Sequence, residues 1–289
     1  MAAQSRLSSG WDAVWPAPAK LNLFLHIVGR RADGYHLLQT VFRFIDVGDT
    51  LHFSPRSEGR IELATPLPGV APDADLTVRA ARALQVATGC TQGAGIRVDK
   101  RLPMGGGLGG GSSDAATTLI ALNRLWNCGL SAAELQRIGL TLGADVPVFI
   151  HGRNTFAEGV GERFTDVTLP AAWYLVLVPP VAVPTAAIFT APDLRRDTPL
   201  IAAADWRPGV GRNDLEPVAC RLYPEVARHL DWLRRHAPAG HSAMSGSGAC
   251  CFAEYVAKGE AEAALTALPA DMRGFVAQGL SFHPLLDLT

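Results

Sequence analysis

A strand is the first element that the pattern of apolar and polar positions predicts. Residues 19–28, AKLNLFLHIV, place apolar side chains at alternate positions, and the positions between them hold Lys20, Asn22, Phe24 and His26. A period of two is typical of a strand with two different faces. We therefore expect a strand with polar groups near its start on one face, followed by a turn at Asp33-Gly34.

The remaining patterns predict a mixture of strands and helices. Further strands are expected at residues 40–46, 50–54, 60–64, 94–99, 173–178, 249–255 and 273–278. Helices are expected at residues 75–88, 112–127, 131–142, 215–236 and 259–267, with a loop, or a loop with short helices, at 185–212. Strands dominate the first 100 residues and mix with helices afterwards, which indicates an α+β fold with two lobes. We expect a loose extension over residues 1–10, one lobe over 11–165 and a second over 166–289.

Composition narrows the class of protein. The 289 residues fit two domains, and 26 basic against 27 acidic residues leave a net charge of −1, which favours neither nucleic acid nor an anionic membrane as partner. The longest apolar run, residues 171–183, is shorter than the ~20 residues that cross a bilayer, and residues 1–10 lack the apolar core of a secretory signal. Five cysteines without a C-x-x-C spacing argue against a disulfide framework or a zinc site. We expect a cytoplasmic protein.

Glycine is the residue type in excess, and the excess is concentrated. Of 29 glycines, six lie between Gly105 and Gly111, where only Leu108 interrupts them. Glycines let backbone N–H groups turn toward one point, and the helix expected to follow adds unpaired donors and the positive end of its dipole. The run therefore predicts a polyphosphate site. Its residues are Pro103, Met104, Gly105, Gly106, Gly107, Leu108, Gly109, Gly110, Gly111, Ser112 and Ser113, and the two serine hydroxyls can cap the helix or bind phosphate or hydrated Mg²⁺.

Other interpretations of the run fit less well. The P-loop pattern fails because no lysine precedes Ser112. Gly105, Gly107 and Gly110 satisfy the dinucleotide pattern G-x-G-x-x-G, but a second helix is expected where a dinucleotide fold needs a strand. A flexible linker is disfavoured because the run passes directly into an amphipathic helix.

Three segments together resemble the GHMP kinase family: PAPAKLN at residues 16–22, the glycine run with Ser112-Ser113-Asp114, and SGSGA at residues 245–249. The longer stretches at residues 18–42, 99–123 and 139–152 are similar in particular to the members that phosphorylate a hydroxyl of a cytidine-diphosphate sugar alcohol on the non-mevalonate route to isoprenoids. The resemblance implies a ribosomal-protein-S5-like N-terminal lobe and a ferredoxin-like C-terminal lobe. ATP with Mg²⁺ and the sugar alcohol would meet between them. We expect the protein itself to be a monomer or weak homodimer.

The resemblance also implies roles for individual residues. Lys20 and Asp145 would be the catalytic pair. The substrate cytosine would lie between Tyr35 and Phe189, with His36 reading its edge, and the other substrate contacts would be Asn22, Thr185 and Gly246. Lys100 is a candidate wall of the adenine pocket. Asp75 stands where the family usually has asparagine, which leaves the adenine contact open, and Mg²⁺ has no candidate ligand beyond Ser112 and Ser113.

The chemistry of the pair agrees with these roles. Asp145 follows Gly143-Ala144 and precedes apolar residues that predict its burial, and a buried carboxylate needs a partner or a function. Lys20 interrupts an apolar strand, where an unpaired lysine is costly. We expect Asp145 to accept the hydroxyl proton while Lys20 polarises that oxygen. The alternatives for the two residues are a structural aspartate and a lysine at the edge of a sheet. The alternatives for the whole protein are a homoserine or mevalonate kinase, a nucleotide sensor without catalysis and a Rossmann oxidoreductase.

Overall fold

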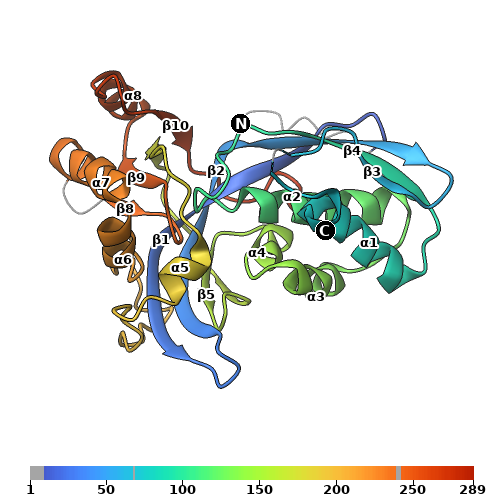
Figure 1. The fold of residues 1–289 in the computed structure, drawn as a ribbon, viewed down its shortest axis with the longest axis horizontal. Helices are drawn as coiled ribbons and strands as arrows, with labels where there is room; N and C mark the ends of the chain where they lie inside the picture. The colour runs from blue at the N-terminus through green and yellow to red at the C-terminus, as the bar shows by residue number, and fades with distance from the viewer. Residues whose placement is uncertain (1–9, 68, 239–241) are drawn as a thin grey trace.

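The computed structural model describes residues 10–67, 69–238 and 242–289 of the chain, and two sheets organise them. One sheet lies in each half of the elongated molecule, and helices pack against both (Figure 1). The predicted α+β class with two lobes is confirmed. The extension predicted for residues 1–10 lies, except for Gly10, outside the described residues.

The first sheet is built on a long antiparallel hairpin, β1 (Trp15–Arg30) and β2 (His36–Arg56). The other strands follow the order β3-β4-β2-β5-β6: β3 (Ile61–Leu63), β4 (Gly93–Asp99), β5 (Thr155–Glu158) and β6 (Arg163–Asp166). Among the described strands only β3 and β4 pair in parallel, so the Rossmann alternative is wrong.

The two strands expected at residues 40–46 and 50–54 are one strand, β2. Gly48 does not end it, because β1 follows β2 across this point through a register shift between Pro18 and Ala19. A Cβ atom at Gly48 would lie 2.3 Å from the Ala17 carbonyl oxygen, so only glycine allows the strands to approach here.

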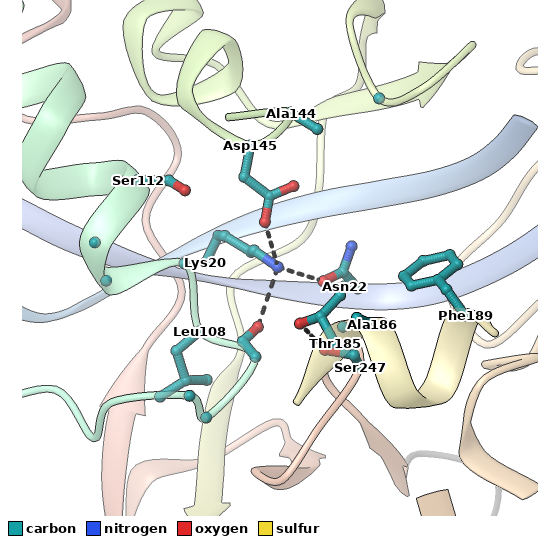
Figure 2. Close-up of a pocket in the computed structure, with 18 of the residues that line it drawn as sticks. Lys20, Asn22, Leu108, Ser112, Ala144, Asp145, Thr185, Ala186, Phe189 and Ser247 are labelled. Carbon is teal, nitrogen blue, oxygen red and sulfur yellow. Dashed lines mark hydrogen bonds and ion pairs between the residues drawn. The ribbon is translucent and has the colours of Figure 1, made fainter. Parts of the chain in front are cut away.

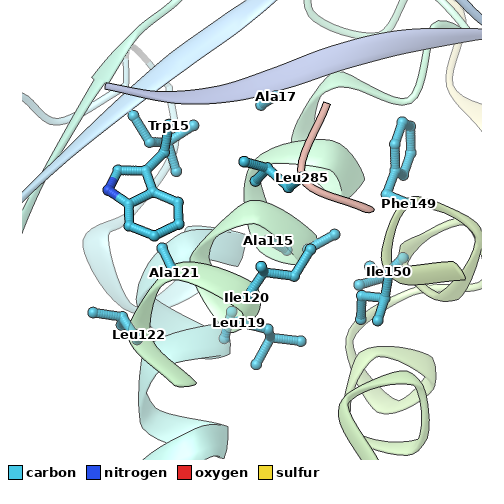
Figure 3. Packing of buried hydrophobic residues seen from close by; sticks show 14 of the residues in the cluster. Trp15, Ala17, Ala115, Leu119, Ile120, Ala121, Leu122, Phe149, Ile150 and Leu285 are labelled. Carbon is cyan, nitrogen blue, oxygen red and sulfur yellow. The ribbon is translucent and has the colours of Figure 1, made fainter. Parts of the chain in front are cut away.

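Helices cover one face of the first sheet: α1 (Leu76–Thr88), α2 (Gly110–Leu125), α3 (Ala132–Leu142) and α4 (Val146–His151), after a 3-10 turn at Pro72–Ala74. α2 is the central helix and is buried along most of its length. Figure 3 shows its side chains between Trp15 of β1 and Ile150 of α4, with Leu285 from the end of the chain beside them. α3 begins with a capping box, since Ser131 and Glu134 bond each other's backbone N–H groups.

The second sheet has the order β10-β7-β9-β8. Its strands are β7 (Trp173–Leu177), β8 (Ser242–Met244), β9 (Cys251–Tyr255) and β10 (Gly274–Gln278), and its helices are α5 (Thr185–Phe189), α6 (Glu216–Leu222), α7 (Pro224–His236) and α8 (Lys258–Thr266). The single helix expected at 215–236 is two helices, because Pro224 disfavours helical backbone at the residue before it, and Tyr223 has φ −132° and ψ 89°.

The last residues of the chain return to the first lobe. Gly279 bridges to Ile45 of β2, and the His283 ring packs 5.7 Å from the ring of Phe44. Leu285 lies in the core of the first lobe, and a short 3-10 turn, Leu286–Leu288, follows it. The division of the chain at residue 165 stays a prediction. The final segment was expected in the second lobe, but it packs on the first. Within the described ranges, no helix is both long enough and apolar enough to cross a membrane.

Candidate active site

A cavity of about 1020 Å³ receives residues from both lobes. It is lined by the β1–β2 hairpin, the glycine run, the start of α4, α5 and the loop at residues 246–248. All the sequence-predicted site residues except Ser113 contribute to its wall: Lys20, Asn22, Tyr35, His36, Lys100, Pro103, Met104, Gly105, Gly106, Gly107, Leu108, Gly109, Gly110, Gly111, Ser112, Asp145, Thr185, Phe189 and Gly246. Segments far apart in the sequence therefore meet at one place.

The glycine run adopts the backbone conformation for which glycine was expected. Gly105, Gly107 and Gly109 have φ values of +66°, +73° and +73°, a region that other residues rarely adopt. A Cβ atom on Gly107 would lie 2.1 Å from the Ser245 carbonyl oxygen. Gly109 is the N-cap of α2, and the last two glycines of the run begin the helix, so the free N–H groups of its first turn open at the cavity.

The two serines after the run differ in position. No side chain caps α2, because Gly109 rather than a serine occupies the N-cap. Ser113 is fully buried and its Oγ donates to the Pro18 carbonyl oxygen at 2.7 Å, so the prediction of Ser113 as a phosphate or Mg²⁺ contact conflicts with its position. Ser112 is half-buried and lines the cavity. One hydroxyl of the pair is therefore available to a ligand.

Backbone hydrogen bonds join the glycine run to the loop that carries the second glycine motif. Ala249 N–H donates to the Gly105 carbonyl at 3.3 Å, and Cys250 N–H donates to the Gly106 carbonyl at 3.1 Å. Ser245 Oγ donates to the Gly107 carbonyl at 2.9 Å. These contacts fix the run against the second lobe. The glycines are therefore needed for their positive φ values, and the run is not a flexible linker.

Lys20 lies at the centre of the site with its ammonium group fully engaged (Figure 2). Its Nζ donates to Asn22 Oδ1 at 2.6 Å and to the Gly107 carbonyl at 3.0 Å, and it lies 3.2 Å from Asp145 Oδ2. Only 3% of its side chain is exposed. The expectation that this lysine is buried with a partner is confirmed, and it brings a fixed positive charge to the cavity.

Asp145 is less buried than its apolar neighbours predicted. Its side chain is 36% exposed, and it lines the cavity. It is the N-cap residue of α4, but its carboxylate makes no capping hydrogen bond. The following residues Val146, Val148 and Phe149 are buried on the core side, whereas the N-cap position lies at the cavity. One carboxylate oxygen therefore faces Lys20, and the group remains accessible to a substrate hydroxyl.

Asn22 connects the lysine to both lobes. Its Nδ2 donates to Thr40 Oγ1 at 2.9 Å, and its backbone N–H donates to Ser245 Oγ at 3.3 Å. The amide is 2% exposed, so its orientation is fixed, with Oδ1 toward the ammonium group of Lys20. Sequence analysis had placed Lys20 and Asn22 on one face of the strand, and this placement is confirmed.

Two further polar residues shape the site, and neither had a role assigned from sequence. Asn213 is buried and donates from Nδ2 to the carbonyls of Met244 and Gly246, at 2.8 and 2.7 Å, which holds the loop beside the glycine run. Ser247 Oγ is 2.9 Å from Thr185 Oγ1, at the start of α5. Asn213 lies in a segment whose sequence has no periodic pattern. The one feature that could have indicated its role is its position as a polar residue just before the apolar start of a helix.

The ring cluster expected for a base lies at the hairpin end of the cavity. The His36 and Phe189 rings are 5.0 Å apart with an interplanar angle of 45°, and Tyr35 is 65% exposed nearby on the rim. Partial burial, followed by the charges of Arg196 and Arg30, lowers the pKa of His36 below its ordinary value. His36 is therefore neutral near pH 7.

Lys100, another residue of the cavity wall, lies between two buried carboxylates. It contacts Asp49 and donates to Asp114 Oδ2 at 2.8 Å. Burial raises the pKa of Asp114 to about 7, against the lowering effect of Lys100. Asp75 is buried as the N-cap of α1, where its Oδ1 accepts from Thr77 N–H at 2.8 Å. That oxygen is thus occupied within the protein.

Metal-binding and thiol chemistry have little support elsewhere in the described part of the chain. No group of three or more histidine, cysteine or acidic side chains is placed to hold a metal ion among residues 10–67, 69–238 and 242–289. All five cysteines are free thiols, and burial raises the pKa of Cys250 to about 12. The cavity, with its lysine, carboxylate and glycine run, is where the described residues offer reactive chemistry.

Comparison with known proteins identifies the family. The GHMP kinases N terminal domain matches residues 75–153, and the GHMP kinases C terminal domain matches residues 195–274. A 4-diphosphocytidyl-2-C-methyl-D-erythritol kinase of Dechloromonas aromatica (strain RCB) is 65% identical over 276 residues, which cover 96% of this chain and 100% of the relative. The protein of that name from Thiobacillus denitrificans (strain ATCC 25259 / T1) is 60% identical over 273 residues, covering 94% and 97%.

Solved structures agree with the sequence matches. The crystal structure of a 4-(cytidine 5'-diphospho)-2C-methyl-D-erythritol kinase is 36% identical, with a TM-score of 0.76, and covers 92% of this chain and 98% of its own. The mevalonate kinase of Methanococcus jannaschii is 16% identical with a TM-score of 0.67, over 92% and 98% of the two chains, and is similar in fold alone. The predicted fold class is confirmed by these matches, and this chain belongs to the GHMP kinase family.

Proposed function

We propose that this protein uses ATP to phosphorylate a hydroxyl of 4-diphosphocytidyl-2-C-methyl-D-erythritol, giving the 2-phosphate, in the non-mevalonate route to isoprenoid precursors. The observation that carries the proposal is the Lys20–Asp145 pair, 3.2 Å apart at the cavity and between the glycine run and the ring cluster. Relatives 60–65% identical that bear the name of this kinase support the choice of substrate.

The catalytic pair divides the work of phosphoryl transfer. The accessible Asp145 carboxylate accepts the proton of the attacking hydroxyl, and Lys20 holds the same oxygen and stabilises the negative charge that develops on it. Because Lys20 is also held by Asn22 and the Gly107 carbonyl, its position does not depend on the carboxylate alone. A fixed cation of this kind costs little reorganisation during the reaction.

ATP is proposed to place its phosphates on the glycine run and the N-terminal turn of α2. GHMP kinases use ATP as co-substrate, and the run offers backbone N–H groups with the positive end of a helix dipole. Mg²⁺, which would arrive with ATP, would supply charge neutralisation at the phosphates. Ser112 is the hydroxyl that fits it, because Ser112 lines the cavity whereas Ser113 Oγ is bonded to Pro18. Lys100 is retained as a candidate wall of the adenine pocket.

The cytidyl group is proposed to bind at the ring cluster. Phe189 and Tyr35 would enclose the base, His36 would read its edge, and the sugar alcohol would extend toward Asp145 past Asn22 and Thr185, with Gly246 beside it. The protein is proposed to act in the cytoplasm, as a monomer or weak homodimer, with small molecules rather than nucleic acid or membranes as its partners.

Measurement of ADP release tests the proposal. Purified protein is mixed with ATP, Mg²⁺ and the cytidyl substrate, and parallel reactions contain mevalonate or homoserine. Activity with the cytidyl substrate alone is expected. Activity with mevalonate or homoserine alone would instead support another GHMP kinase, and ATP binding without turnover of any acceptor would support a nucleotide sensor.

A further inference from the structure

The guanidinium nitrogens of Arg196, which lies outside the predicted site residues, all donate to His36 or to the backbone at and after the end of α5. Its Nε donates to His36 Nε2 at 3.1 Å. Its Nη1 donates to the Leu194 carbonyl at 2.9 Å, and its Nη2 donates to the carbonyls of Phe189 and Ala191 at 3.1 and 2.8 Å. One side chain therefore fixes the His36 ring and the end of α5 that carries Phe189.

The contact with His36 determines which ring nitrogen carries the proton. An arginine guanidinium is always protonated and has no acceptor, so Nε must be the donor and His36 Nε2 the acceptor. In a neutral imidazole the other nitrogen then carries the hydrogen. His36 is consequently the Nδ1–H tautomer. Nδ1 has no hydrogen-bond partner among the described residues, and the ring lines the cavity.

The charged groups around His36 favour the neutral ring. Arg196 approaches from the segment after α5, and Arg30 approaches from β1. Asp33, in the turn before His36, is paired with Arg31 at 2.8 Å, and both of these side chains are about half exposed. Partial burial, followed by the charges of the two arginines, lowers the pKa of His36 below its ordinary value, which favours the neutral ring at pH 7.

We propose that Arg196 is a positioning residue of the base site: it holds His36 as a neutral ring whose Nδ1–H donates to an acceptor on the edge of the bound pyrimidine. Without the arginine, the neutral ring is free to carry its hydrogen on Nε2, and Nδ1 then becomes an acceptor that faces another acceptor. This inference rests on the proposed function for the identity of the base. The assignment of the His36 tautomer does not depend on the proposed function.

The kinetic test uses Arg196→Met, with Arg195→Met as the matched control. Arg195 is the adjacent arginine, half exposed, and its Nε bonds to Asp197 at 3.2 Å. In Arg196→Met, the KM for the cytidyl substrate is expected to rise on the order of tenfold at pH 8, with the KM for ATP little changed. Below about pH 6.5 the rise should shrink, because a protonated ring donates from both nitrogens.

A purely structural role for Arg196 would predict a KM increase of equal size at every pH, and that result would overturn the proposal. Arg195→Met should resemble the parent protein throughout. Arg196→Lys keeps a cation but loses the bonds to the carbonyls, and it should restore part of the affinity at pH 8, since an ammonium group can still donate to Nε2.

A spectroscopic test separates this inference from the proposed function. In ¹⁵N-histidine NMR of the ligand-free protein, His36 should show the Nδ1–H tautomer at pH 7, and Arg196→Met should shift it toward Nε2–H. An Nε2–H tautomer in the parent protein would refute the inference whatever the enzyme phosphorylates. Failure of the parent to use the cytidyl substrate would refute the proposed function while leaving the tautomer assignment intact. If Arg196→Met does not fold, the spectrum of the parent still decides.

Discussion

Lys20 Nζ and Asp145 Oδ2 lie 3.2 Å apart, but the lysine side chain is 3% exposed and the aspartate side chain 36% exposed. The cation is thus fixed inside the protein, and its counter-ion lies at the surface of the cavity. Asn22 and the Gly107 carbonyl also hold the ammonium group, so the lysine keeps hydrogen-bond partners when the carboxylate changes. In this arrangement Lys20 stays fixed, while the Asp145 carboxylate is accessible to a substrate.

The substitution Asp145→Asn tests the proton acceptor directly. An amide retains the shape of the carboxylate but does not take up a proton, so turnover is expected to fall by ~10²–10⁴-fold. The KM for ATP and the melting temperature should change little, because the side chain makes no capping bond and is partly exposed. Asp271→Asn, in a surface pair with Arg228, serves as the control and should retain full turnover. Near-normal turnover of Asp145→Asn would remove this residue from the role of base.

The glycine run offers a test with a closely matched control, Gly107→Ala against Gly129→Ala. The two glycines have φ values of +73° and +71°, so a Cβ atom imposes a similar backbone strain of about 1 kcal/mol at each. At Gly107 the Cβ atom would also lie 2.1 Å from the Ser245 carbonyl oxygen, whereas nothing lies within 4 Å at Gly129.

We expect Gly107→Ala to displace the run from the loop of the second lobe and to lower kcat/KM for ATP on the order of 100-fold, since misplacement by about 1 Å has effects of this size. Steady-state kinetics and thermal melting of both variants provide the comparison. Gly129→Ala should melt lower by a similar backbone contribution and retain its activity. Equal activity in the two variants would show that contact with the second lobe does not position the run.

Much of this site could be predicted from sequence because its signals are local. Alternation along β1 puts Lys20 and Asn22 on one face, and the glycine run followed by a helix indicates an anion site without any tertiary information. The resemblance to a family then connected these segments with Asp145, which lies 125 positions from Lys20 along the chain. No local sequence pattern spans so large a separation along the chain. The 3.2 Å contact between the two side chains could therefore be seen only in the structure.

The errors have physical causes of the same kind. Asp145 was expected to be buried from its neighbours, but apolar residues on one side of a short helix do not bury the N-cap residue at its open end. Ser113 was expected at the phosphates. Ser112 faces the cavity, but helix periodicity turns the next residue, Ser113, toward Pro18. Arg196 lies in the segment at 185–212, where no periodicity exists and side-chain hydrogen bonds with carbonyls hold the chain.

Replacement of Phe189 by leucine tests the base site. Aromatic stacking on a base is worth ~1–3 kcal/mol, which corresponds to about 5- to 150-fold in affinity. We expect Phe189→Leu to raise the KM for the cytidyl substrate within this range and to leave the KM for ATP unchanged, as measured by initial rates. Phe282→Leu is the control, because Phe282 is an aromatic residue 43% exposed and outside the cavity wall. An unchanged KM for the cytidyl substrate would place the base elsewhere.

The buried His283 predicts how stability changes with pH. Burial lowers its pKa to about 3, so the unfolded chain takes up a proton below about pH 6.5 that the folded protein does not. The unfolded state therefore binds more protons, and the free energy of unfolding should decrease as the pH falls, by about 1.4 kcal/mol per pH unit for this group alone.

The substitution His283→Asn tests this contribution. In the parent protein, the Leu285 N–H donates to His283 Nδ1 at 3.0 Å, and asparagine keeps an acceptor for that N–H while it removes the titration. Urea unfolding at intervals from pH 8 to pH 4.5 should give parallel slopes above pH 7 and a shallower acid slope in the variant. The variant also loses ring packing on Phe44, so its stability is lower at every pH and the comparison is one of slopes. Equal acid slopes would mean that the folded protein admits a proton at His283.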